Sequence, residues 1–189
     1  NLENYESRAN EVLNFLRKQK WVNNKKLVVA GHSQGSKVAT MIALNNKNVT
    51  NLGLFSPNPF GRIDQFIRKS RKEAENNKIT WEKANSEIEE NYQMFREAHN
   101  DSVLKRNPYL IAWKSFSRPL INDWLRIKIP TYLAYGTNDI ASDLCDLVPL
   151  FYIQNSKSNL TFKRYLNLEH NFFETKEDGS VNYEKEHWK

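Results

Sequence analysis

The sequence predicts an α/β protein with a parallel sheet and flanking helices, and three observations support this fold class. Short apolar runs alternate with segments of helical periodicity. The first run lacks the apolar–polar alternation of a half-exposed strand. A serine between two glycines follows this run and leads into another helical pattern. We therefore expect a single domain over residues 1–189, with parallel strands near residues 26–30, 50–55, 131–135 and 160–166.

The amino-terminal segment predicts a helix followed by a buried strand. Apolar residues recur at helical spacing over residues 2–20, with Glu and Lys between them. The following run, Leu27-Val28-Val29-Ala30, has the composition of a strand that is buried on both faces.

The next residues, Gly31-His32-Ser33-Gln34-Gly35, predict a sharp turn from this strand into a helix over residues 36–44. Such a turn is strained, and a side chain at Gly31 or Gly35 is expected to strike the neighbouring strand or helix. It raises the hydroxyl of Ser33 at the carboxyl end of the strand. The alternative interpretation is a strand-to-helix turn of another α/β fold, with Ser33 serving only as a helix cap.

A long insertion follows the second strand, from about residue 60 to about residue 125. Its patterns predict a basic amphipathic helix around Ile63, Phe66 and Ile67, a second helix over residues 80–99 and a short aromatic helix over 109–116. A parallel crossover needs only about a dozen residues. We therefore expect residues 60–118 to form a helical cap over Ser33.

The regular pattern resumes in the last third of the chain. The strand at 131–135 leads into Gly136-Thr137-Asn138-Asp139, and a helix over 144–153 is expected to be interrupted at Pro149. The more polar strand at 160–166 leads into Leu168-Glu169-His170-Asn171-Phe172. A turn at Asp178-Gly179 precedes residues 182–189, which predict the first turns of a closing helix.

Three strand ends therefore carry Ser33, Asp139 and His170, and parallel strand ends share one edge of a sheet. The order serine, acid, histidine and the glycine–serine turn resemble the α/β-hydrolase superfamily. Within the superfamily, the motifs resemble most closely those of the dienelactone-hydrolase, bile-acid-acyltransferase-like and prolyl-oligopeptidase-like branches. The resemblance implies that His170 takes the proton of Ser33, that Asp139 orients His170, and that the backbone N–H of Gln34 binds the oxyanion.

The acid and the base each have alternatives in the sequence. Asp143 and Asp146 could replace Asp139, although both fall inside a predicted helix. Of the other histidines, His32 is expected to be supporting structure, because it is fixed in the turn of the nucleophile. His99 and His187 are expected on the surface, and the carboxylate of Glu169 is expected in solvent.

Composition and the absence of certain motifs argue against several kinds of binding partner. The net charge of +6 is dispersed among acidic residues, so no nucleic-acid partner is expected. No apolar run has transmembrane length, so no membrane partner is expected. No metal-ligand cluster or glycine-rich phosphate loop occurs, so no metal or cofactor is expected. The resemblance to hydrolases implies a small acyl substrate as the partner. The single cysteine excludes an internal disulfide and leaves the compartment, cytoplasmic or exported, open.

The resemblance also implies further strands upstream of the strand that precedes Ser33, and a loop that supplies a second oxyanion donor. One helix alone precedes this strand here, so we expect its free edge to pair with an upstream segment or another chain. Three functions stay open: a serine hydrolase of carboxylic esters or thioesters, a peptidase of the prolyl-oligopeptidase-like kind, and a non-catalytic binding module.

Overall fold

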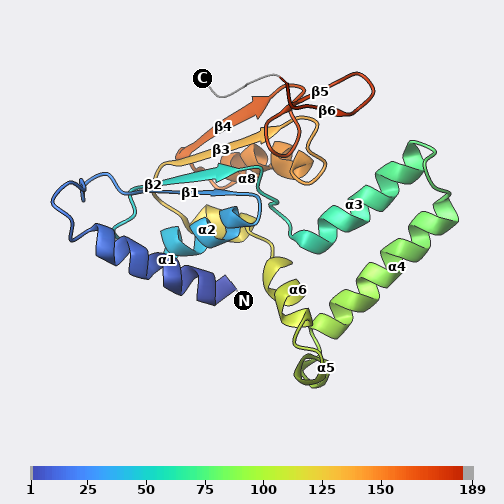
Figure 1. Ribbon diagram of the computed structural model, residues 1–189, viewed down its shortest axis with the longest axis horizontal. Helices are drawn as coiled ribbons and strands as arrows, with labels where there is room; N and C mark the ends of the chain where they lie inside the picture. The colour runs from blue at the N-terminus through green and yellow to red at the C-terminus, as the bar shows by residue number, and fades with distance from the viewer. Residues whose placement is uncertain (1, 185–189) are drawn as a thin grey trace. The chain divides into compact units, whose positions relative to one another are not determined.

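The computed structural model describes residues 2–184, which form two compact units, residues 2–59 with 120–184 and residues 60–119. The first unit contains a four-stranded parallel sheet in the order β1-β2-β3-β4 (Figure 1). Its strands are β1 (Val28–His32), β2 (Asn51–Phe55), β3 (Thr131–Gly136) and β4 (Leu160–Tyr165). The predicted fold class, strand number, direction and order are confirmed.

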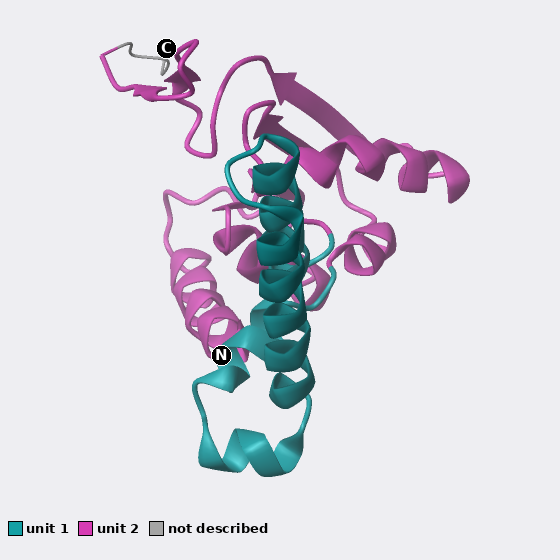
Figure 2. Ribbon diagram, turned by 90° about the vertical axis from the view of Figure 1, so that its right-hand side faces the viewer, with its two compact units in different colours: residues 1, 60–119 teal, residues 2–59, 120–189 magenta. Residues whose placement is uncertain are grey.

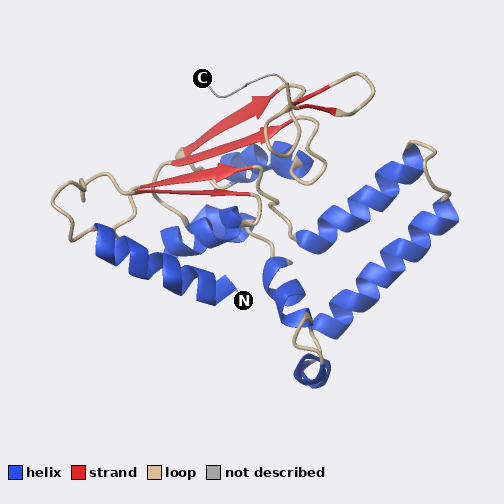
Figure 3. Cartoon of the chain, in the orientation of Figure 1, coloured by secondary structure: helices blue, strands red, loops and turns tan. Residues whose placement is uncertain are grey.

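One face of the sheet is covered by the helices α1 (Leu2–Leu16), α2 (Gly35–Asn45), α7 (Ile121–Arg126) and α8 (Val148–Gln154) (Figure 3). Register partners place Leu54 and Leu133 on this face, and both side chains are fully buried. The indole Nε1–H of Trp124 in α7 donates to the Thr40 hydroxyl of α2 at 2.9 Å. Burial of these apolar side chains, with this polar pair satisfied, holds the layers together.

The opposite face of β1 is open. Val28 is 61% exposed, and Ala30 and His32 are exposed as well. The prediction that this strand is buried on both faces is therefore wrong. Among the described residues, α2 packs on one face of β1, and β2 is its neighbour within the sheet. The run of apolar residues indicated a buried strand, but burial depends on what the rest of the chain places over it.

Residues 60–119 form a helical unit, which Figure 2 colours separately. Its helices are α3 (Arg62–Glu75), α4 (Trp81–Ala98), α5 (Asp101–Arg106) and α6 (Leu110–Phe116). The pair α3 and α4 packs closely, with the fully buried Ala84 in α4 and a hydrogen bond of 2.8 Å from the Ser70 hydroxyl to Glu87. Three basic residues of α3 pair with acids one turn later or earlier: Arg68 with Asp64, Lys69 with Glu73 and Arg71 with Glu75.

Two predictions near the carboxyl terminus need correction. Pro149 lies at the start of α8, where the preceding 3-10 helix η1 (Asp143–Leu147) ends, so it begins the α-helix instead of interrupting one. The closing helix is not formed over residues 182–184: β5 (Glu174–Thr175) and β6 (Val181–Asn182) make a hairpin around Gly179, whose φ is +80°. The rest of that predicted helix, and His187, lie outside the described residues.

Candidate active site

The carboxyl ends of β1, β3 and β4 bring Ser33, Asp139 and His170 together. His170 lies between the other two, with Nε2 at 2.7 Å from the Ser33 hydroxyl oxygen and Nδ1 at 2.8 Å from Oδ2 of Asp139. With Nδ1 protonated, His170 donates to the carboxylate, and its free Nε2 accepts from the serine hydroxyl. Chemically, this arrangement can remove a proton from a serine hydroxyl while the resulting imidazolium faces an anion.

The turn that carries Ser33 is strained as the sequence predicts. Ser33 has a φ of +53°, in the left-handed region that side chains rarely adopt. Its N–H still donates to the Phe55 carbonyl at 2.8 Å, which extends the β1–β2 ladder by one residue. A Cβ at Gly31 would lie 2.2 Å from the carbonyl oxygen of Gly35. The turn therefore requires glycine at position 31.

The turn does not require glycine at position 35, so the prediction that a side chain there would strike a neighbouring strand or helix is wrong. A Cβ at this position would meet nothing within 4 Å. The reason is that Gly35 borders an open apolar hollow of about 550 Å³ along the free edge of β1, lined also by Tyr5, Val12 and Val28. Beside it, the N–H of Gln34 has no hydrogen-bond partner among the described residues. This N–H is therefore free to donate to a group bound beside Ser33.

The turn over residues 136–139, which follows β3, holds Asp139 in a buried position. Its side chain is held by the Ala141 N–H, which donates to Oδ1 at 2.9 Å and leaves Oδ2 for His170. A Cβ at Gly136 would lie 2.2 Å from the Leu168 carbonyl oxygen, so the glycine lets the histidine loop approach the end of β3.

The rival acids lie elsewhere. Asp143 is in η1, and Asp146 accepts from the Tyr135 hydroxyl and from Arg164, both at 2.5 Å. His170 Nδ1 contacts Asp139.

Glu169 shapes the histidine loop, which the sequence analysis missed. Its Oε1 accepts the backbone N–H groups of Asn171 at 2.8 Å and Phe173 at 3.0 Å. The expectation of a fully solvated carboxylate is therefore wrong, because Glu169 is half-buried and closes the turn. The signal was available in the spacing, since an acidic side chain can bond backbone N–H groups a few residues on.

The other two described histidines differ. His99 is exposed, as expected, and its Nδ1 lies 2.8 Å from the Phe95 carbonyl oxygen. His32 contacts the histidine loop, with its Nε2 2.8 Å from the His170 carbonyl oxygen.

The surroundings of His170 favour its protonated form. The hydrogen bond with Asp139, together with the charges of Asp139 and Glu169, raises the pKa of His170, and burial opposes this shift. In a proton-transfer role, this favours uptake of the serine proton when the imidazolium forms.

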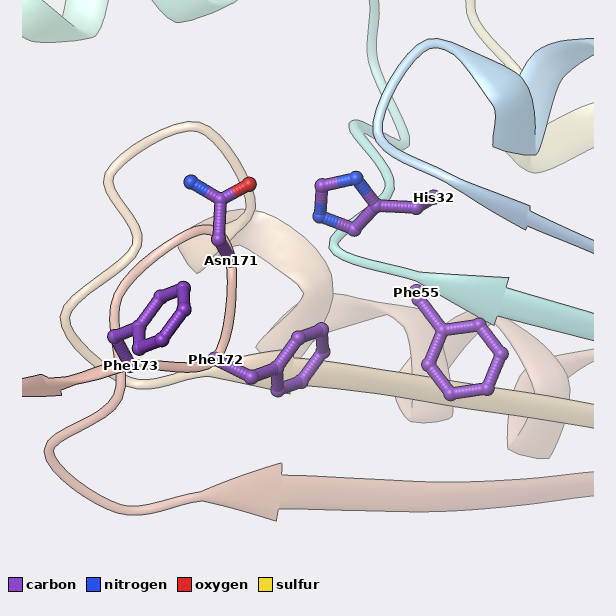
Figure 4. Close-up of a pocket in the computed structure, with 5 residues that line it drawn as sticks. All are labelled: His32, Phe55, Asn171, Phe172 and Phe173. Carbon is purple, nitrogen blue, oxygen red and sulfur yellow. The ribbon is translucent and has the colours of Figure 1, made fainter. Parts of the chain in front are cut away.

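An apolar hollow of about 490 Å³ lies beside the histidine loop (Figure 4). Figure 4 shows the imidazole of His32 directed toward Phe172 and Asn171, with the ring of Phe55 below it. The ring centroids of Phe55 and Phe172 are 6.2 Å apart in an edge-on arrangement, so the walls of the hollow are largely aromatic.

Residues 2–184 contain no group of three or more His, Cys, Asp or Glu placed to hold a metal ion. Within the same residues, no helix is long and apolar enough to cross a membrane.

No protein-family model and no curated protein sequence match this chain. Solved structures do. A 2,6-dihydroxy-pseudo-oxynicotine hydrolase matches with a TM-score of 0.51 at 16% identity, over 88% of this chain and 40% of its own. An alpha/beta hydrolase from the sediment metagenome of the Mar Chica lagoon, Morocco, matches with 0.51 at 13% identity, over 89% and 61%.

A puromycin-hydrolysing peptidase of Mycobacterium tuberculosis matches with a TM-score of 0.56 at 13% identity, over 89% of this chain and 22% of its own. This chain thus spans less than two thirds of the length of each of these three proteins. The likeness to these structures, together with the parallel sheet, shows that it has the α/β-hydrolase fold.

Proposed function

We propose that this chain is a serine hydrolase that cleaves a carboxylic ester or thioester through an acyl-enzyme on Ser33. One observation carries the proposal: His170 lies at hydrogen-bond distance from both Ser33 and Asp139 while Ser33 occupies a strained turn at a strand end. Strained backbone at a nucleophile, with a base in reach and an acid behind the base, supports nucleophilic catalysis.

Acylation begins when the Ser33 oxygen attacks the substrate carbonyl carbon and His170 Nε2 accepts the hydroxyl proton. The carbonyl oxygen becomes an oxyanion, which the Gln34 N–H binds. The tetrahedral intermediate then collapses: the bond to the leaving oxygen or sulfur breaks, and His170 returns the proton to the leaving group. Asp139 keeps the proton on Nδ1 and stabilises the imidazolium throughout.

Deacylation repeats these steps with water. His170 Nε2 accepts a proton from water as the water oxygen attacks the acyl carbon. The second tetrahedral intermediate then collapses: the bond between the acyl carbon and the Ser33 oxygen breaks, His170 returns the proton to the Ser33 oxygen, and the carboxylic acid is released. A water molecule is consumed, and no redox partner or cofactor is needed.

The test is the release of p-nitrophenol from an acetyl or butyryl ester, measured before steady state. The wild-type chain should give a burst of up to one equivalent followed by slower turnover, and Ser33→Ala should abolish both phases. The exposed Ser86→Ala variant is the matched control and should behave as wild type. A burst or turnover that survives Ser33→Ala would refute the proposal, and release from folded wild type no faster than the uncatalysed rate would favour the non-catalytic binding module.

A peptidase acting on an amide is the second candidate, because one structural neighbour is a peptidase. The p-nitroanilide with the same acyl group separates the two. We expect ester cleavage to be much faster than anilide cleavage; comparable values of kcat/KM would favour the peptidase.

A further inference from the structure

The main-chain carbonyl of His170 is held by two side chains from outside its own loop. His32 Nε2 lies 2.8 Å from this carbonyl oxygen, and the Ser56 hydroxyl donates to it at 2.7 Å. We propose that His32 and Ser56 are positioning residues, which fix the backbone of His170 so that its imidazole stays between Ser33 and Asp139. The proposal rests on the proposed function for its kinetic consequence, but not for its structural one.

His32 directly precedes Ser33 in the chain, so its hydrogen bond to the His170 carbonyl connects the loop of His170 to the turn that carries Ser33. A carbonyl oxygen can only accept, so Nε2 of His32 must carry a proton. The imidazole centroids of His32 and His170 are 4.9 Å apart. The ring centroid of Phe172 lies 6.4 Å from that of His32, and Figure 4 shows these two side chains. The histidine loop is therefore fastened to the end of β1 by both a hydrogen bond and ring contacts.

Ser56 fastens the same carbonyl to the end of β2. Its side chain is 1% exposed, and its N–H donates to the Ala134 carbonyl at 2.8 Å, which ties it to β3. Its φ of +45° lies in the left-handed region, where the backbone of a non-glycine residue is strained. Glycine would adopt this backbone without strain, but it has no hydroxyl to donate to His170.

The contacts of Glu169 do not replace these two bonds. They join residues 169, 171 and 173 to one another and shape the loop, but they do not attach it to β1 or β2. A carbonyl oxygen has two lone pairs, and His32 and Ser56 occupy them from two different strands. We therefore expect the two donors to be partly redundant, with a double variant losing more than the single variants together.

The test compares His32→Leu, which removes the donor, with His32→Gln, whose amide N–H stands the same number of bonds from the backbone. Ser56→Ala removes the second donor, and His99→Leu is the matched histidine control. We expect His32→Leu to slow reaction of Ser33 with a fluorophosphonate about 10-fold and the double variant His32→Leu/Ser56→Ala about 100-fold, the effect typical of a reacting group displaced by about 1 Å. His32→Gln should restore most of the rate.

The second measurement does not need activity. The Nδ1 proton between His170 and Asp139 should give a low-field proton resonance, assigned by its loss in Asp139→Asn. The resonance should persist in wild type, His32→Gln and His99→Leu, and broaden or disappear in the double variant. This outcome would support the proposal even if the chain proved not to hydrolyse esters.

Two results would overturn the proposal. One is a folded double variant that keeps both the resonance and the wild-type labelling rate. If the double variant does not fold, the His32 pair decides: a Gln variant no faster than the Leu variant, with the same resonance in both, would refute a positioning role.

Discussion

Gly31→Ala and Gly35→Ala offer a matched pair within one turn. A Cβ at Gly31 would lie 2.2 Å from the Gly35 carbonyl oxygen, 2.4 Å from its carbon and 2.6 Å from the Ser36 nitrogen, whereas ordinary contact begins at 3.4 Å. All three atoms are backbone atoms of the turn and of the start of α2, so the turn itself must move by about 1 Å.

In the wild-type chain the Ser33 hydroxyl oxygen lies 2.7 Å from His170 Nε2. Movement of the turn by about 1 Å would take the hydroxyl out of this hydrogen bond. A displacement of about 1 Å at a reacting atom costs roughly 100-fold in rate, and the overpacking costs about 1–3 kcal/mol of stability. A Cβ at Gly35 meets nothing within 4 Å. Gly35→Ala should therefore stay within about 2-fold of the wild-type rate, as a substitution in open space does.

The assay is the rate of p-nitrophenyl acetate hydrolysis, with thermal melting of each variant in parallel. The expected result is a large rate loss for Gly31→Ala at a temperature where it is still folded, and near-normal activity for Gly35→Ala. Equal losses in both variants, or an active Gly31→Ala, would refute the account of why this turn needs glycine.

Four further predictions follow from the site. Asp139→Asn should lower kcat about 10⁴-fold, by analogy with triads in general, while Asp143→Asn should change it little; the reverse would assign the acid to Asp143. The raised pKa of His170 should place the acidic limb of the kcat/KM–pH profile above pH ~6.5, and Asp139→Asn should move it down; an unshifted limb would contradict the hydrogen bond as its cause. Because folding raises this pKa, protonated His170 stabilises the fold at low pH, and this contribution is lost as pH rises through the raised value, which urea unfolding of wild type against His170→Gln can measure. A segment that pairs with the free edge of β1 and adds a second oxyanion donor beside Gln34 should raise acetyl-ester hydrolysis at least about 100-fold; equal rates with and without it, with Ser33 required in both, would show that the chain completes its own site.

Local patterns were sufficient to predict the parallel sheet, because the alternation of apolar runs with helical periodicity can be read within each segment. They also placed Ser33, Asp139 and His170 at strand ends, which the structure brings within hydrogen-bond distance. The strand-to-helix turn could be predicted for the same reason: the close approach at Gly31 involves residues only four and five positions away.

The features that the sequence analysis missed depend on distant segments. The exposure of Val28 and the empty space at Gly35 follow from what packs beside β1, which no pattern within β1 records. The bond from His32 to the His170 carbonyl joins residues 138 positions apart. The short helices α5 and α7, six residues each, are too brief to show a period.

The placement of residues 60–118 as a cap over Ser33 stays a prediction. Truncating exposed aromatic side chains of this unit, such as Tyr109, should change KM for bulky esters more than kcat if the unit narrows access to Ser33.

The central claim is that Ser33 is a nucleophile activated by His170. Its most direct test is peptide mapping by mass spectrometry after reaction with a fluorophosphonate. We expect one adduct, on the peptide containing Ser33, formed at a rate that falls sharply in His170→Gln and not in His99→Gln. An adduct on another residue, or no adduct on the folded wild-type chain, would contradict it.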